Sequence, residues 1–154
     1  MTIAALETMT LSNADRRAHL CRQHQALRAL VDQTRRAAFA ALADDGEAGR
    51  LVSAVAALES ELSAHLATEE ALLGPILAGI DAWGPVRLDR LRAEHRQQRA
   101  SLAALVHSGG VRVAASRAIA FCGELAEDMS FEERELFGED VLRDDCVAVD
   151  AADA

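Results

Sequence analysis

The feature that most constrains the fold is an imperfect internal repeat, in which residues able to bind a metal stand among apolar residues at helical spacing. The first copy is Leu62-Ser-Ala-His65-Leu-Ala-Thr-Glu69-Glu70, and the second is Leu125-Ala-Glu-Asp128-Met-Ser-Phe-Glu132-Glu133. In each copy a candidate ligand stands four residues before a glutamate, which places both side chains on one helix face. A repeated helix pair that projects such ligands inward is how a helical bundle builds a two-metal site.

One more histidine on a helical pattern precedes each copy of the repeat. The candidate metal ligands are therefore, in chain order, His24, His65, Glu69, His95, Asp128 and Glu132. They share the apolar stripes of their helices: His24, for example, stands four residues after Leu20 and three before Leu27. A single histidine on such a stripe is usually a hydrogen-bonded core residue. Six polar groups on core faces would instead each cost several kcal/mol unless paired, and coordination to a cation removes that cost.

The pattern of apolar residues and helix breakers predicts an all-α fold, an antiparallel up-down-up-down four-helix bundle. Apolar residues make up 51% of the chain and there are only two prolines, a composition that favours helices. The first helix is expected to be capped by Ser12 or Asn13. The expected helix breaks are residues 44–47, Gly74-Pro75, residues 82–85, and Ser108-Gly109-Gly110. Gly74-Pro75 is expected to kink or end the second helix, because proline lacks a backbone N–H. Short connections place successive helices antiparallel.

At 154 residues the chain is expected to form one domain. Residues 1–12 are expected to be an N-terminal extension and residues 13–142 the bundle. Residues 143–154 are acidic and alanine-rich without periodicity, which predicts a disordered tail.

Charge and composition exclude several classes of function. The formal net charge of −9 argues against binding to nucleic acid, whose phosphates would be repelled. No apolar run of about eighteen residues is present, so no membrane span is expected. Residues 1–10 lack the basic and apolar regions of a signal peptide, so a cytoplasmic location is expected. The chain has no tyrosine, which excludes di-iron enzymes that depend on a tyrosyl radical.

In these motifs the chain resembles the hemerythrin-like proteins of the HHE cation-binding family, over roughly residues 14–142. The resemblance is carried by the ordered set His24, His65, Glu69, His95 and Glu132, and by the acidic-then-apolar stretches 69–75 and 132–137. It implies a four-helix bundle that holds two non-heme iron ions joined by an oxo or hydroxo bridge, with manganese or zinc as alternatives. It also implies a protein that handles dioxygen, nitric oxide or peroxide, or senses iron and oxygen.

The resemblance implies a role for each matching residue. Glu69 and Glu132 would bridge the two ions, and His24, His65 and His95 would be terminal ligands.

Two positions depart from the family pattern. The fourth terminal ligand, a histidine in the family, is Asp128 here, and Arg99 stands where oxygen-carrying hemerythrins have a further histidine. Because a guanidinium cannot ligate a cation, reversible dioxygen carriage of that kind is not expected. A carboxylate at position 128 would make the cluster less positive and lower its reduction potential.

Three functions from different classes fit the sequence. The first is a di-iron protein that reacts with or senses dioxygen, peroxide or nitric oxide; if it is an enzyme, a di-iron oxidoreductase is expected. The second is a carboxylate-rich di-iron oxidase or ferroxidase, which Asp128 favours. The third is a bundle that has lost its metals and acts as a regulatory or dimerisation module. In each case we expect a monomer or homodimer that binds neither nucleic acid nor membrane.

Overall fold

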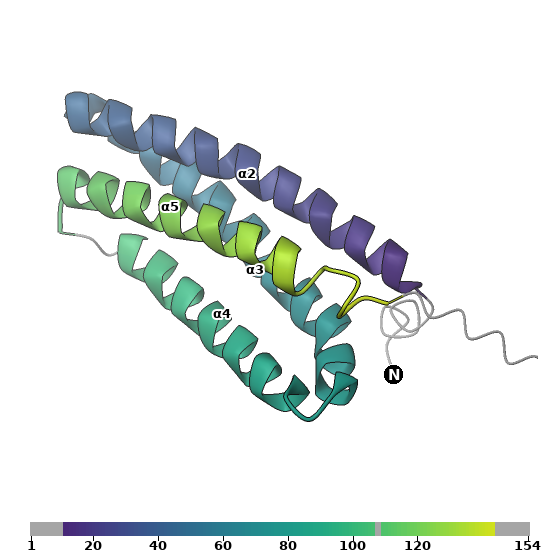
Figure 1. Ribbon diagram of the computed structural model, residues 1–154. Coiled ribbons are helices and arrows are strands. Elements are labelled where there is room, and N and C mark those ends of the chain that lie inside the picture. The colour runs from purple at the N-terminus through teal and green to yellow at the C-terminus, as the bar shows by residue number, and fades with distance from the viewer. Residues whose placement is uncertain (1–10, 107–108, 144–154) are drawn as a thin grey trace, which may run out of the picture.

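The computed structural model describes residues 11–106 and 109–143, and the remaining residues lie outside that description. The expected N-terminal extension and acidic tail therefore fall almost wholly outside the described residues. Within those ranges the chain forms a helical bundle without strands (Figure 1). Its elements are α2 (Asn13–Ala43), the short 3₁₀ turn η1 (Asp45–Glu47), α3 (Ala48–Ile80), α4 (Gly84–Val106) and α5 (Val111–Glu135). None of the described helices is both long enough and apolar enough to cross a bilayer.

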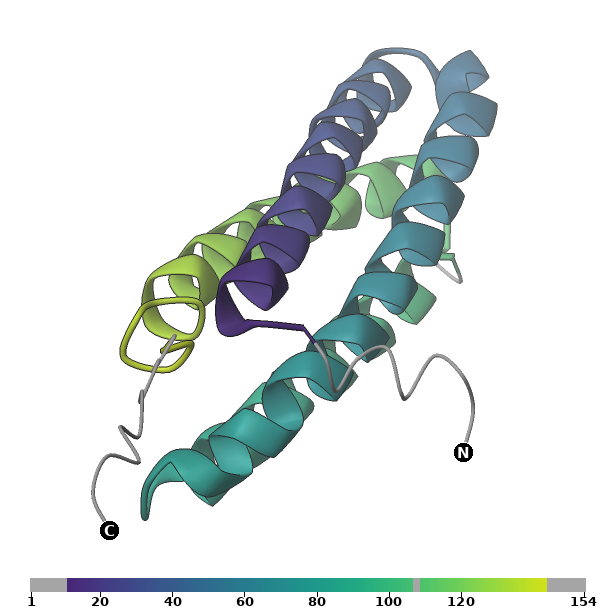
Figure 2. The ribbon, with the colours of Figure 1, turned by 90° about the vertical axis from the view of Figure 1, so that its right-hand side faces the viewer.

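Successive helices run in opposite directions, which confirms the predicted antiparallel bundle (Figures 1 and 2). Helix α2 packs against both α3 and α5, and α3 packs against α4. The contact between α4 and α5 is much less extensive, and Figure 1 shows these two helices diverging towards the C-terminal end of α5. The seam between α4 and α5 is therefore the most open side of the bundle.

The ends of α2 follow from local side-chain chemistry. Ser12 caps the helix, because its hydroxyl accepts a hydrogen bond from the backbone N–H of Asp15 at 3.0 Å. The helix ends at Ala43, where the Asp44 carboxylate accepts from the backbone N–H of Gly46 at 2.9 Å. Of the two predicted caps, Ser12 is the one the structure uses, and the helix ends directly before the break predicted at residues 44–47.

Gly74-Pro75 was expected to kink or end α3, and the structure excludes the second of these outcomes. The helix continues to Ile80 with Pro75 inside it. Proline removes one hydrogen bond from the helix interior, but Leu73 and Leu77 on either side are fully buried. The burial of these side chains stabilises the helix beyond the proline.

The connection from α3 to α4 requires glycine at the first residue of α4. A Cβ atom on Gly84 would lie 1.8 Å from the backbone oxygen of Leu77, far inside contact distance. The Asp81 carboxylate accepts from the backbone N–H of Trp83 at 2.8 Å and from Arg87 at 2.9 Å, which stabilises the turn. Helix α4 begins at Gly84, so Pro85 lies in its first turn, where the N–H that proline lacks has no partner within the helix.

Beyond α5, the chain folds back over the start of α2. Arg17 donates to the backbone oxygen of Phe137 at 2.6 Å and to that of Leu142 at 2.7 Å. The side chain of Asn13 donates to the backbone oxygen of Arg143. Phe137 and Leu142 are buried, so this segment forms part of the core at that end.

The core is divided into two apolar clusters by a layer of polar residues. The first cluster lies towards η1 and includes Leu27, Leu66, Leu102 and Met129. The second lies towards the α3–α4 turn and includes Leu20, Leu72, Leu91 and Leu136. Along each helix a candidate ligand stands between members of the two clusters; these ligands are His24, Glu69, His95 and Glu132. The polar layer therefore lies at mid-bundle, closed by apolar side chains on both sides.

Candidate metal centre

Five of the six predicted ligands converge in the polar layer. His24 comes from α2, His65 and Glu69 from α3, His95 from α4 and Glu132 from α5, and each is at most 4% exposed. They form two groups, His24 with His65 and Glu132, and Glu69 with His95 and Glu132. Within each group the candidate ligand atoms lie within 4.8 Å of one another. Glu132 belongs to both groups, which is the arrangement expected of a carboxylate shared by two ions.

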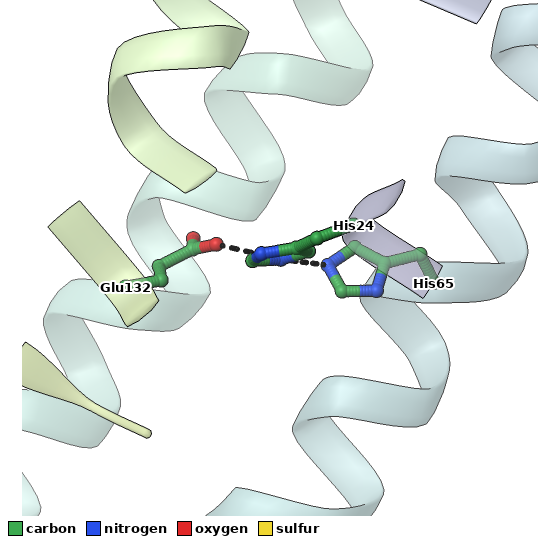
Figure 3. Close-up of side chains that lie close together, drawn as sticks. All are labelled: His24, His65 and Glu132. Atoms are coloured by element: carbon green, nitrogen blue, oxygen red, sulfur yellow. Dashed lines mark hydrogen bonds and ion pairs between the residues drawn. The ribbon is translucent and has the colours of Figure 1, made fainter. Parts of the chain in front are cut away.

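The first group brings ring nitrogens and a carboxylate to one point (Figure 3). Nε2 of His24 lies 3.2 Å from Nε2 of His65 and 3.4 Å from a carboxylate oxygen of Glu132. Two facing imidazole nitrogens form a hydrogen bond only when one of them carries a proton. When neither does, their lone pairs face the same point, where a cation would be bound.

Glu69 of the second group lies between His95 of its own group and His65 of the first. One of its oxygens is 3.4 Å from Nε2 of His65 and 3.2 Å from Nε2 of His95. These distances are short, but the atoms are not oriented for hydrogen bonds, so both oxygens of Glu69 and Nε2 of His95 are buried without a hydrogen-bond partner. A buried polar atom left unpaired costs about 1–3 kcal/mol. A cation that accepts these nitrogen and oxygen lone pairs would remove that cost, so the residues fit a metal.

The outer nitrogen of His24 is held by an ion-paired glutamate. Nδ1 lies 2.9 Å from Glu133, which in turn accepts from Arg28 at 2.7 Å and 3.0 Å. Because a carboxylate only accepts hydrogen bonds, Nδ1 carries a proton, and in the neutral ring Nε2 then presents a lone pair to the centre. The ring is thus oriented for binding a cation.

The outer nitrogens of the other two histidines are held in the same way. Nδ1 of His95 lies 2.8 Å from Glu70, which Arg99 approaches at 3.4 Å. Nδ1 of His65 lies 3.0 Å from the side-chain oxygen of Gln23. All three imidazoles therefore direct Nε2 inward, two of them backed by a charged glutamate and one by a neutral amide.

The two inward carboxylates have opposite electrostatic environments. Burial disfavours ionisation of Glu69, but His65 and His95 outweigh it and lower the pKa to about 2. Burial, helped by Glu69 and only partly offset by His24, raises the pKa of Glu132 to about 7. Burial also lowers the pKa of a histidine, yet the carboxylates beside His24 and His95 outweigh it and raise the pKa of both. The site concentrates negative charge and lone pairs among buried side chains.

Asp128, the sixth predicted ligand, belongs to neither group. It is half-buried on α5, and its carboxylate accepts from Nε2 of Gln98 at 3.1 Å. Its side chain is shorter than the histidine that occupies the matching position of the first repeat. Direct ligation by Asp128 stays a prediction.

The sequence analysis did not single out Gln23 or Arg28. A signal was present for Arg28. It follows His24 by four residues, as Arg99 follows His95, so the pattern His-x3-Arg is itself repeated. At that spacing the arginine shares a helix face with its histidine, and each arginine contacts the glutamate that holds the ring.

Comparison with known proteins gave one family. The family model described as hemerythrin HHE cation binding domain matches residues 16–139. The matched span contains all six candidate ligands and the residues that hold the three imidazoles. No match was found among curated proteins or among solved structures.

Proposed function

The chain belongs to the hemerythrin HHE cation-binding domain family, and on that premise we propose that it is a non-heme di-iron protein that reacts with or senses dioxygen, peroxide or nitric oxide. One ion would be held by His24, His65 and Glu132, and the other by Glu69, His95 and Glu132. The observation that carries the proposal is the presence of Glu132 in both groups, which supports two ions sharing one carboxylate.

The surrounding residues suit this chemistry. Bound iron would supply the change of oxidation state that small oxidants require. Glu133, Glu70 and Gln23 hold the three imidazoles in the tautomer that can bind a metal. The two apolar clusters exclude water from either side of the layer.

A second candidate function is that of a carboxylate-rich oxidase or ferroxidase. It is supported by the composition of the second group, two carboxylates and one imidazole, because oxygen ligands stabilise ferric iron. A module that has lost its metals is not favoured, since both oxygens of Glu69 and Nε2 of His95 would then stay buried without a hydrogen-bond partner.

The proposal is tested by elemental analysis and near-ultraviolet absorbance of the chain purified without added metal. We expect about two iron ions per chain in the wild type. Glu132→Gln should keep roughly half of that iron or less, because its loss affects both ions. Manganese or zinc in place of iron would change the metal assignment. If the wild-type chain neither carries nor takes up metal, both redox functions are excluded and the regulatory or dimerisation module is the remaining candidate. Turnover with peroxide or with ferrous iron then separates the two redox candidates.

A further inference from the structure

A row of hollows follows the seam between α4 and α5 and reaches the candidate metal centre. The largest has a volume of about 550 Å³, and Glu132 forms part of its wall. A hollow of about 90 Å³ adjoins it, sharing Glu94 and Asp128. A third, of about 200 Å³, shares Ser101 and Glu124 with the second. We call this row the α4/α5 groove; its lining includes Glu132, the residue that both ligand groups share.

The charges at the mouth of the groove favour a cation. Four carboxylates line the largest hollow, Glu94, Glu127, Asp128 and Glu132, against two guanidinium groups, Arg90 and Arg134. Arg90 donates to Glu94 at 2.8 Å, so these two charges offset each other, which leaves Glu127, Asp128 and Glu132 against Arg134. A cleft lined mainly by one sign of charge raises the local concentration of ions of the opposite sign.

An oxygen atom without a partner lies beside Asp128. Gln98 is only 6% exposed and donates through Nε2 to Asp128 at 3.1 Å. Its other side-chain atom, Oε1, is buried with no hydrogen-bond partner, and the residue lines the same hollow as Asp128. Amide and carboxylate oxygens are the ligands that hard divalent cations prefer. The Asp128 carboxylate, held by Gln98, thus offers an ion a first oxygen contact within the groove.

Asp128 in the groove and Glu132 in the candidate metal centre are separated by one turn of α5. Asp128 and Glu132 stand four residues apart on α5 and therefore share a helix face. Both line the largest hollow, whereas only Glu132 belongs to the ligand groups. An ion held at Asp128 would thus be one helical turn from a residue of both ligand groups.

We propose that the α4/α5 groove is the entry route for a divalent cation, and that Asp128, held by Gln98, is a transient ligand that passes the ion to Glu132. This inference rests on the proposed function, because an entry route requires a metal site at its end. The ligand is a hydrated divalent cation, iron(II) under reducing conditions, and its transfer involves no change of oxidation state.

The test follows the uptake of iron(II) by the metal-depleted full-length chain under anaerobic conditions. Stopped-flow mixing with iron(II), followed by a chromogenic chelator that traps the free ion, gives the rate of uptake, and elemental analysis gives the final content. Asp128→Asn keeps the side-chain volume and removes the charge. Asp89→Asn is the matched control, since Asp89 is an exposed carboxylate of α4 outside the residues that line these hollows.

We expect Asp128→Asn to take up iron roughly tenfold more slowly, at the low end of the acceleration that a charged cleft gives to association. Its final iron content should equal that of the wild type, and Asp89→Asn should match the wild type in both measurements. Asp128→Glu, which keeps the charge, should recover most of the rate. Added salt should slow the wild type more than Asp128→Asn, because salt screens the charge of the groove.

The outcomes separate this inference from the proposed function. If Asp128→Asn loads at the wild-type rate, the entry route is wrong while the metal site stands. If Asp128→Asn ends with less iron, Asp128 is a resident ligand and its transient role is overturned. If the wild type takes up no iron, the proposed function fails and the entry route fails with it.

Discussion

Each inward histidine has its outer ring nitrogen occupied by an acceptor, and this determines what the ring can do. Glu133 holds His24, Glu70 holds His95, and the neutral Gln23 holds His65. The acceptor fixes the proton on the outer nitrogen and orients the ring, so that the inner nitrogen is available without further rearrangement.

Replacing Glu133 by glutamine should therefore weaken metal binding without removing a ligand. The amide has no charge and can rotate to present its NH₂ group to the ring. We expect metal affinity to fall by about 10–100-fold, the usual effect of losing such a partner. Competition with a chelator of known affinity measures this change. Glu135→Gln, an exposed carboxylate of the same helix, is the control; an equal loss in the control would contradict the role of Glu133.

Metal retention should fall as the pH is lowered through the neutral range. The pKa of Glu132 is raised to about 7, and the pKa values of His24 and His95 are raised as well. A raised pKa means that the proton is held up to a higher pH, so below neutrality an ion must displace more protons to bind. Dialysis of the loaded chain against a chelator across a pH series should show release beginning near pH 7. Constant retention down to about pH 5 would argue against these residues as ligands.

Among the helices and turns, the apolar periodicity predicted the four helices and the capped start of α2, because these depend on local spacing and local hydrogen bonds. It could not decide between a kink and an end at Pro75, since the outcome depends on how deeply Leu73 and Leu77 are buried in the bundle. The hydrogen bonds from Arg17 to the backbone of Phe137 and Leu142 join segments more than a hundred residues apart, and no local sequence pattern indicates them.

The turn before α4 should be sensitive to a single methyl group. Gly84→Ala places a Cβ atom where the backbone oxygen of Leu77 already lies, and we expect a loss of about 1–3 kcal/mol in the free energy of unfolding. Gly123→Ala lies inside α5, where an added Cβ would meet no heavy atom within 4 Å, and should instead stabilise by about 0.5–1 kcal/mol. Urea unfolding of both variants measures the difference. Equal stability would show that the turn can shift to relieve the contact.

At the scale of the whole molecule, the convergence of five of the six candidate ligands could be predicted from the sequence, because they recur on the apolar stripe of each helix. The environment of Asp128 could not, because it depends on how far α4 and α5 diverge. The repeat places Asp128 where His65 stands, yet α4 and α5 have a far less extensive contact than α2 and α3. Asp128 therefore lines a groove and pairs with Gln98.

Removing the metal should lower the thermal stability of the bundle without unfolding it. Ligands that bind only the folded state stabilise it, by about 2.7 kcal/mol at a hundredfold excess over the dissociation constant. The two apolar clusters do not depend on the metal, so helix content should persist. Circular dichroism of the loaded and chelator-treated chain tests both statements. An unchanged melting temperature would contradict metal binding in the folded core.

The contacts between the start of α2 and the segment after α5 also have a topological consequence. Asn13 and Arg17 bind the backbone of residues 142 and 143, so the start of α2 and the end of the described chain lie together (Figure 2). The first and last parts of the described chain are therefore neighbours in space. A circular permutant, joined by a short linker between these two ends and opened at the exposed Gly109-Gly110, should keep every helix and the polar layer intact.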